Sequence, residues 1–417
     1  MAEVRGEILI GRSPEDVFDF VADERHEPLF NPNMTGCELV SGEPVTAGSR
    51  FQATLRSARR SMPITVECTA LDRPHRLASH SVIGGARIDG DLRFQPEGTG
   101  TRMRWHWTIT PPRPLRATDR LVGFMGARQE RRIWRGLENL MEVSAEGAVS
   151  IREDGRPGSP AVVFLHGAGA SGGMWRDHMA ELSDRFHCLA PDLPGFGRSN
   201  HLPPLSLPAT AELVADLIRS RIPARRAHLV GLSWGGAIAH NLLEHHPDLI
   251  DRVVIDGAGV IPWAPGKLIL AGVAATSPFL HTRAVTAVIG SVVGMDDDGR
   301  ADLRAASPRA FRSAFFEGFH PEPPRKELDA PCPTLLVAGE SEKAVRRSNA
   351  ALASVMPDAV ARFVPGGGHG WIGRRPELHA RLVEAWLTGG DLPAGLAVEP
   401  DSPDAVGRLR RIAGRTT

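Results

Sequence analysis

The chain has 417 residues, of which 42% are hydrophobic and 24% are charged. This length and composition are typical of a globular protein with two or three domains. Lysine and arginine together number 49, as do aspartate and glutamate, so no net charge favours nucleic-acid binding. No apolar run is long enough to cross a bilayer, and residues 1–14 lack the apolar core of a signal peptide. We therefore expect a cytoplasmic protein that binds neither nucleic acid nor membrane.

Four cysteines are spread along the chain, at Cys37, Cys68, Cys188 and Cys332. They form neither a Cys-x-x-Cys pair nor a cluster with histidine, so the sequence predicts no metal site and no cofactor. We interpret them as small buried thiols in a reducing compartment.

The N-terminal third shows the pattern of an antiparallel sheet with two helices. Apolar and polar residues alternate over 64–70, 88–94 and 103–109, and this period of two is typical of strands with one buried face. Ser13, followed by a proline and two acids, predicts the start of a helix. A long amphipathic helix is expected over residues 121–141, where apolar residues recur at near-helical spacing.

The order of these elements resembles the START-like superfamily, which includes the polyketide cyclases. Residues 8–23 are similar to the opening segment of that family, and Pro32 falls where its chain commonly turns. The resemblance implies an α+β helix-grip domain over residues 1–146, in which the long helix closes a cup that often holds an apolar ligand. Trp105 and Trp107 can be read equally as core residues or as ligand contacts.

From residue 147 to about 391, predicted strands alternate with helices, which is typical of a parallel sheet covered on both faces. The expected strands are 162–165, 186–189, 227–230, 253–255, 334–337 and 362–365. A hairpin with its turn at Asp154-Gly155 is expected before them. Residues 260–321 or so predict an apolar helical cap over the site, and residues 392–417 a flexible tail.

Two Gly-x-Ser-x-Gly motifs occur in the chain, and their contexts differ. Ser233 lies directly after a predicted strand and directly before a predicted helix, which is the position of an exposed nucleophile on a sharp turn. Gly231 and Gly235 are needed there because side chains would collide across the turn. Ser171 lies several residues beyond its strand, in a glycine-rich loop. We therefore expect Ser233, and not Ser171, to be the nucleophile.

The glycine-rich loop that begins at Gly167 supports a rival interpretation. It also reads Gly-x-Gly-x-x-Gly after a strand, and Asp192 follows at about the spacing of an acid that binds a dinucleotide ribose. Two observations weaken the rival. Asp192 lies in a turn after its strand, and a nucleotide site leaves Ser233 and His369 without a role.

Four motifs together resemble the alpha/beta-hydrolase fold in content and in order. They are Phe164-Leu165-His166-Gly167-Ala168, residues 192–199, the turn at Ser233, and Gly368-His369-Gly370. The resemblance implies a doubly wound α/β sheet with a helical cap, and it assigns the backbone N–H groups of Ala168 and Trp234 to an oxyanion hole. Such fixed donors need no reorganisation when charge develops on a substrate oxygen.

A serine hydroxyl needs a base within reach, and the resemblance points to His369, which follows the last predicted strand in a run of glycines. The acid that orients this histidine is expected after strand 334–337. Many relatives have aspartate three residues after the glycine there, whereas this chain has Glu342. Glu340 and Asp256 remain alternatives for the acid.

The sequence therefore predicts a serine hydrolase that cleaves an ester, thioester, lactone or diketone-like bond of a small apolar molecule. Dehalogenases and epoxide hydrolases of this fold attack with aspartate, where this chain has Ser233, and the chain has no tyrosine to serve as an epoxide hydrolase proton donor. The alternatives are a dinucleotide-binding protein and a non-catalytic protein that binds hydrophobic ligands. We also expect the N-terminal domain to hold or deliver the substrate. The sequence does not specify an oligomeric state.

Overall fold

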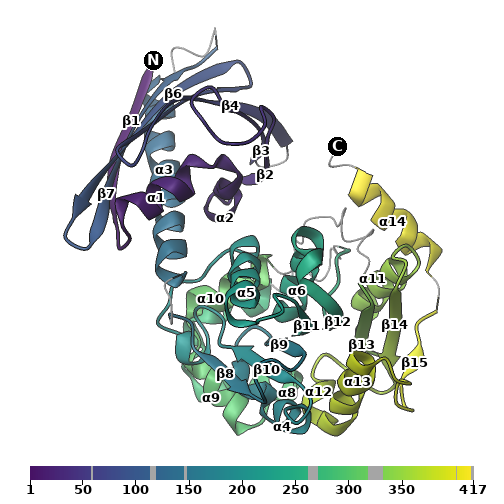
Figure 1. The fold of residues 1–417 in the computed structure, drawn as a ribbon. Coiled ribbons are helices and arrows are strands. Elements are labelled where there is room, and N and C mark those ends of the chain that lie inside the picture. Colours follow the sequence, from purple (N-terminus) through teal and green to yellow (C-terminus); the bar gives the residue numbers. More distant parts are fainter. Residues whose placement is uncertain are drawn as a thin grey trace. The chain divides into compact units, whose positions relative to one another are not determined.

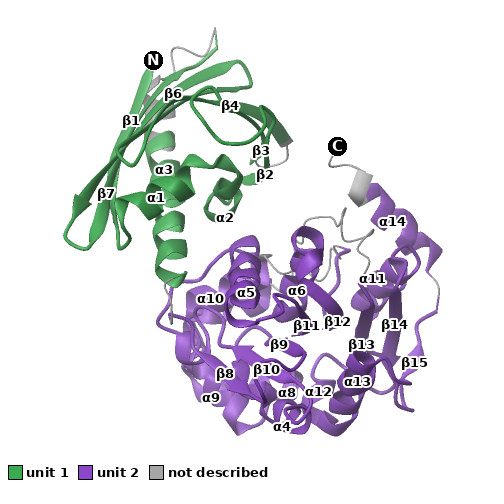
Figure 2. Ribbon diagram, viewed as in Figure 1, with its two compact units in different colours: residues 1–145 green, residues 146–417 purple. Residues whose placement is uncertain are grey.

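The computed structural model of this protein (Figure 1) describes residues 1–57, 60–112, 119–144, 148–261, 271–317, 332–400 and 402–414. The chain forms two compact units, residues 1–145 and residues 146–417 (Figure 2). No helix in the described part of the chain is long and apolar enough to cross a membrane.

Unit 1 is a seven-stranded antiparallel sheet, in the order β1-β7-β6-β5-β4-β3-β2, that curves around a long helix (Figure 1). Its elements are β1 (Ala2–Ile10), α1 (Pro14–Ala22), η1 (Glu24–His26), α2 (Glu27–Phe30), β2 (Met34–Leu39), β3 (Arg50–Ser57), β4 (Arg60–Asp72), β5 (Arg76–Ile83), β6 (Ala86–Glu97), β7 (Gly100–Thr110) and α3 (Asp119–Val143). Short helices after the first strand, a sheet and a closing helix are the elements expected of a START-like domain.

Local chemistry explains where the helices of unit 1 begin and what they cover. The Ser13 hydroxyl accepts the N–H of Asp16 and so caps α1, as its sequence predicts. On the sheet, Trp105 is only 3% exposed, whereas Trp107 retains accessible surface. Both rings lie near Trp134 of α3, with centroids 6.0 and 6.4 Å away. Trp105 is therefore a core residue, and Trp107 lies at the margin of the core.

Unit 2 contains the predicted parallel sheet, in the order β15-β14-β13-β12-β11-β9-β10-β8. The strands are β8 (Ile151–Asp154), β9 (Ala161–Leu165), β10 (His187–Pro191), β11 (Ala227–Leu232), β12 (Ile250–Asp256), β13 (Thr334–Gly339), β14 (Ala359–Val364) and β15 (Ala397–Val398). The six inner strands are mutually parallel, and the two edge strands are antiparallel to their neighbours.

The hairpin expected at Asp154-Gly155 is wrong. β8 pairs with β10 and not with the next strand in sequence, β9, so that Asp154 lies opposite Cys188. The reason is that β9 already has β10 on one side and β11 on the other, so the free edge of β10 is where β8 can add.

Successive residues of a strand point to opposite faces of the sheet. Because the strand residues are apolar on both faces, helices cover both. Val163 and Leu229 belong to one core cluster, whereas Val162 and Val230 belong to the other. The helices outside the cap are η3 (Gly172–Trp175), α4 (Arg176–Leu182), η4 (Gly197–Ser199), α5 (Leu207–Arg221), α6 (Trp234–His245), η5 (Pro247–Leu249), α11 (Lys343–Ala353), α12 (Trp371–Arg374), α13 (Pro376–Thr388) and α14 (Pro403–Gly414).

The predicted cap is an insertion between β12 and β13. Its described elements are all helical: η6 (Ser277–Phe279), α8 (Arg283–Val292), α9 (Asp297–Ala305) and α10 (Pro308–Glu317). Phe311 of α10 and Leu303 of α9 are fully buried and lie against Gly169 of the glycine-rich loop. Trp263, Leu268, Ile269 and Leu270, which the sequence also assigns to the cap, lie outside the described residues.

The structure differs from the flexible tail expected over residues 392–417. β15 pairs with β14, and α14 packs against α11 with Leu409 fully buried. Arg346 of α11 also forms an ion pair with Glu399, at 2.8 Å. The many arginines of this segment make it look like a polar tail in the sequence. Its apolar residues Ala405 and Leu409 are four positions apart, however, which places both side chains on one face of a helix.

Candidate active site

Ser233 lies on a strained turn between β11 and α6. Its backbone has φ 55° and ψ −109°, a region that residues other than glycine rarely adopt. This conformation costs about 1–3 kcal/mol. Its N–H donates to the carbonyl of Asp256 on the neighbouring strand, at 2.8 Å. A Cβ at Gly231 would lie 2.5 Å from the oxygen of Gly235, and one at Gly235 would lie 2.1 Å from the oxygen of Leu165. Both glycines are therefore required, for the steric reason that the motif predicts.

His369 connects the serine to a carboxylate. Its Nε2 lies 3.1 Å from Ser233 Oγ, and its Nδ1 lies 2.7 Å from Glu342 Oε1. The other oxygen of Glu342 accepts the N–H of Gly339 at 2.7 Å, which fixes the carboxylate. Burial disfavours the imidazolium, but the hydrogen bond and the charge of Glu342 outweigh burial, so the pKa of His369 is raised.

The two alternative acids take other positions. Glu340 is exposed, and its carboxylate accepts the N–H of Gly366 at 2.7 Å. Asp256 is 1% exposed, and its Oδ2 lies 3.9 Å from His379 Nε2. Burial, together with the nearby charge of Glu342, raises the pKa of Asp256 to about 8. Of the three candidate acids, the one hydrogen-bonded to the His369 imidazole is Glu342.

The glycine-rich loop is engaged in internal contacts. The Ser171 hydroxyl donates to Asp302 of the cap and accepts the N–H of Gly173. The Asp192 carboxylate accepts the N–H groups of Gly172 and Arg198, both at 2.8 Å. Asp192 therefore closes its own turn and ties that turn to the glycine-rich loop, which gives the carboxylate a structural role.

A cleft opens in front of the Ser233 hydroxyl and contains about 310 Å³, counting space that is open to solvent. It is lined by Ala168, Ser233, Trp234, Gly257, Ala258, Gly259, Ala314 and Phe315. The structure thus brings the two residues expected to form the oxyanion hole, Ala168 and Trp234, to the same cleft as the serine. Among the described residues, no group of three or more His, Cys, Asp and Glu side chains could hold a metal ion.

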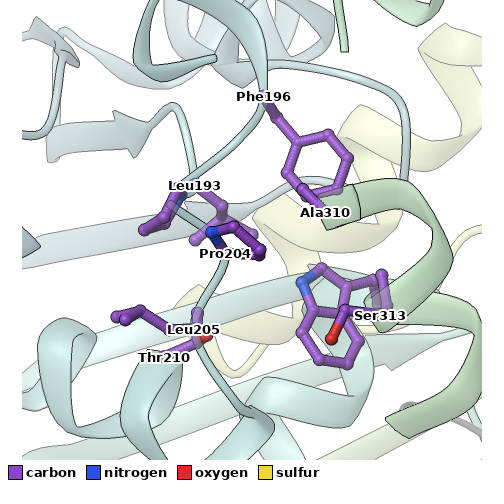
Figure 3. Close-up of a pocket in the computed structure, with 10 residues that line it drawn as sticks. Leu193, Phe196, Pro204, Leu205, Thr210, Ala310 and Ser313 are labelled. Atoms are coloured by element: carbon purple, nitrogen blue, oxygen red, sulfur yellow. The ribbon is translucent and has the colours of Figure 1, made fainter. Parts of the chain in front are cut away.

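A second pocket of about 220 Å³, measured in the same way, adjoins this cleft (Figure 3). It is lined by Leu193, Pro194, Phe196, Pro204, Leu205, Thr210, Trp234, Ala310, Ser313 and Ala314. Trp234 and Ala314 line both cavities. None of the described residues that line either cavity carries a charge.

One part of the cleft wall, residues 257–259, could not be predicted from the motifs. Gly257 follows β12, has φ 63°, and lies so close to the imidazole that a Cβ would be 2.9 Å from His369 Cε1. The small residues Gly257, Ala258 and Gly259 come directly after a buried strand, at the carboxyl edge where sites form in open α/β sheets. This run of small residues was the available signal.

Two protein families match the chain. The model of the alpha/beta hydrolase family matches residues 162–382, which is more than half of the chain. The model described as polyketide cyclase / dehydrase and lipid transport matches residues 1–145. The two matches correspond to the fusion that the sequence motifs indicate.

Individual relatives agree with these matches. An AB hydrolase superfamily protein of Gibberella zeae is 26% identical over 262 residues, which span 58% of this chain and 86% of that protein. A pimeloyl-[acyl-carrier protein] methyl ester esterase of Vibrio vulnificus is 36% identical over 95 residues. That match spans 23% of this chain and only 35% of the esterase.

A solved carboxylesterase structure from Nitrososphaera gargenis has the same fold as unit 2. It superposes with a TM-score of 0.51 at 15% identity and covers 58% of this chain and 94% of its own. The sheet order, the two family matches and these relatives lead to one conclusion: the chain belongs to the alpha/beta hydrolase family, and a polyketide cyclase-type domain precedes its hydrolase domain.

Proposed function

We propose that this protein is a serine hydrolase that cleaves an ester or a related acyl bond of a small apolar molecule. The observation that carries the proposal is the continuous hydrogen-bonded chain from the Ser233 hydroxyl through His369 to Glu342, with distances of 3.1 and 2.7 Å. A nucleophile, a base and an orienting acid in hydrogen-bond reach of one another are the parts that acyl transfer requires.

The residues of the site divide the steps of this mechanism among them. His369 Nε2 takes the proton of Ser233 Oγ as the oxygen attacks the substrate carbonyl carbon. Glu342 stabilises the imidazolium that results. The N–H groups of Ala168 and Trp234 donate to the oxygen that becomes negative. His369 then gives its proton to the departing alcohol oxygen, and the acyl group stays on Ser233 until water, activated by the same histidine, releases it.

The substrate class follows from the walls of the site. The described residues that line the cleft and its adjoining pocket are uncharged, and most are apolar. Such a lining favours an apolar substrate, which gives up no strong hydrogen bonds to water when it binds. Unit 1 belongs to a family described as including lipid transport, which also supports a small apolar ligand. We propose that unit 1 holds or delivers such a molecule to the hydrolase.

The test is to identify the residue that becomes acylated. The full-length protein is incubated with a fluorophosphonate probe, digested and mapped by mass spectrometry. The proposal predicts one adduct, on the peptide that contains Ser233. It also predicts a burst of p-nitrophenol, of about one equivalent per enzyme, when an excess of a slowly deacylating p-nitrophenyl ester is mixed with the protein. Absence of both labelling and hydrolysis, in a protein that binds hydrophobic ligands, would favour the non-catalytic alternative.

Calorimetric titration of the full-length protein with NAD and with NADP distinguishes the dinucleotide-binding hypothesis from the hydrolase hypothesis. We expect no binding, because Leu303 and Phe311 cover the glycine-rich loop: a Cβ at Gly169 would lie 2.5 Å from Leu303 and 3.1 Å from Phe311. Binding with micromolar affinity would restore the rival hypothesis.

A further inference from the structure

Two tryptophans of unit 1 lie on the face of the sheet that curves around α3 (Figure 1). Trp105 is paired with Gly6 of β1, and Trp107 is paired with Gly90 of β6. A Cβ at Gly6 would lie 2.2 Å from the Trp105 ring, and one at Gly90 would lie 1.8 Å from the Trp107 ring. Each indole therefore lies over the neighbouring strand, in the space that a side chain would otherwise take.

One carboxyl of α3 lies among these rings. Glu130 is four residues before Trp134, so both side chains are on the same face of the helix. The indole N–H groups of Trp107 and Trp134 lie near the Glu130 carboxyl and partly offset the effect of its burial on its pKa. Neither N–H makes a hydrogen bond of ordinary geometry with the described residues, although Trp134 is only 5% exposed. Buried donors are normally satisfied, so this group of side chains is incomplete without a ligand.

Two further carboxyls belong to the same region of unit 1, Glu24 of η1 and Glu27 of α2. Burial and the negative charge of Glu27 raise the pKa of Glu130 to about 7 and raise the pKa of Glu24 well above its usual range. Among the described residues, the charged groups that act on Glu24 and Glu130 are all acidic. The three glutamates therefore form a region of uncompensated negative charge.

The basic side chains that follow Asp23 in this segment are engaged elsewhere. Arg25 forms an ion pair with Asp23 at 2.6 Å, and His26 Nδ1 lies 2.8 Å from the carbonyl oxygen of Phe20. Within the described part of unit 1, the three glutamates do not form a cluster that could hold a metal ion. Negative charge that is spread beside aromatic rings suits an organic cation, which is larger than a metal ion and carries apolar surface.

We propose that unit 1 binds a protonated amine attached to an apolar body, with Glu130 and Glu27 as the anionic partners of the ammonium group. The apolar body would lie against Trp107, which retains accessible surface. With the cation bound, the ionised carboxylate of Glu130 can accept the ammonium on one oxygen and the two indole N–H groups on the other. This inference narrows the class of ligand proposed above for unit 1, and it does not depend on hydrolysis by unit 2.

The experiment compares three probes that share one body and differ in the charge of the head group. Phenylbutylamine, phenylbutanol and phenylbutanoate are titrated into the full-length protein and followed by calorimetry. At about pH 8 the amine remains protonated and Glu130 is ionised. The variants are Glu130→Gln and Glu27→Gln, which keep the shape of each side chain. Glu142→Gln is the matched control, because Glu142 is an exposed glutamate of the same helix.

We expect phenylbutylamine to bind at least about tenfold more tightly than phenylbutanol, because a hydrogen bond between charged groups is worth about that much. Phenylbutanoate should bind most weakly, since its charge has the same sign as the glutamates. Glu130→Gln should weaken amine binding by at least about tenfold and leave alcohol binding unchanged. Glu142→Gln should behave like wild type in all three titrations.

Circular dichroism first verifies that each variant is folded. If Glu130→Gln does not fold, the affinity of Glu27→Gln for the amine decides the question. Glutamine at position 27 keeps the carbonyl oxygen that accepts Asn31 Nδ2 at 2.6 Å, so the local structure is retained.

Equal affinities for the amine and the alcohol, a preference for the carboxylate, or an amine affinity that Glu130→Gln does not change would overturn the inference. Absence of binding by all three probes would overturn it as well. Fluorophosphonate labelling of Ser233 in the same samples separates this site from the hydrolase function. Labelled protein without amine selectivity refutes only the amine site. Amine binding in a protein that is neither labelled nor active supports the site and refutes the hydrolase function.

Discussion

The buried carboxyl of Asp256 makes the stability of the hydrolase unit depend on pH in a way that one substitution should remove. The side chain is 1% exposed, and neither oxygen makes a hydrogen bond of ordinary geometry with the described residues. Burial and the charge of Glu342 raise its pKa from 3.8 to about 8. Between these two values the unfolded chain has released this proton, whereas the folded chain keeps it. Stability is therefore lost as the pH rises from about 4 to about 8.

The size of the effect follows from the shift. One pKa unit corresponds to about 1.4 kcal/mol, so at pH 7 the cost of this carboxyl is on the order of 4 kcal/mol. The substitution Asp256→Asn removes the ionisation but leaves a buried amide whose own desolvation costs about 1–3 kcal/mol. We expect Asp256→Asn to be about 1–3 kcal/mol more stable than wild type at pH 7 to 8. The gain should vanish or reverse near pH 4.

The assay is urea unfolding of the full-length protein at several pH values between 4.5 and 8, followed by a signal from unit 2. The difference between variant and wild type is the quantity of interest, because it cancels the other titrating groups. Asp251→Asn is the control, since that carboxylate is partly exposed and lies 2.8 Å from Arg226. A difference that does not change with pH, or that falls as the pH rises, would refute the reasoning.

Three further predictions concern activity. Glu342→Gln should lower kcat by about 10³–10⁴, because Glu342 is the acid that orients the imidazole. Glu340→Gln should have little effect. The value of kcat/KM should rise with pH through the pKa of His369 and reach its half-maximum above 6.5, because Glu342 raises that pKa and only the neutral imidazole is a base. A chain that begins at residue 148 should cleave short soluble esters like the full-length protein but lose kcat/KM on long-chain substrates.

Each of these predictions has a result that would contradict it. Equal, small effects of the two glutamine variants would move the acid to Asp256. A half-maximum well below pH 6.5 would mean that the charge of Glu342 does not act on the imidazole. For the shortened chain, circular dichroism first verifies folding. An identical profile over all chain lengths would then leave unit 1 without a role in substrate delivery.

Much of the fold could be predicted from the sequence, because alternation and strand–helix order are local patterns. The six inner strands of unit 2 and the described helices of the cap lie in the segments that the sequence pattern predicts. Edge features were harder to predict. Whether β8 pairs with β9 or β10 depends on which strand edge is free, and that is a property of the assembled sheet. The packing of α14 depends on two apolar residues among arginines, a weak signal within a single helix.

The candidate site shows the same division. The turn at Ser233 requires glycine on both sides of the serine for steric reasons, so its position can be derived from the local sequence. The choice among Glu342, Glu340 and Asp256 could not be derived, because all three lie at or just after the ends of neighbouring parallel strands, at the same edge of the sheet. The hydrogen bond from His369 distinguishes them in the structure, and that contact joins residues 27 positions apart.

The measurement that tests the central claim most directly compares Ser233→Ala with Ser171→Ala. Both serines belong to a Gly-x-Ser-x-Gly motif, but the hydroxyl within 3.1 Å of His369 Nε2 is that of Ser233. With a short p-nitrophenyl ester, Ser233→Ala should lose about 10⁴–10⁶ in kcat, and it should no longer react with a fluorophosphonate probe. Ser171→Ala should keep most of both activities. Loss of hydrolysis and labelling in Ser171→Ala, with both retained in Ser233→Ala, would contradict the account.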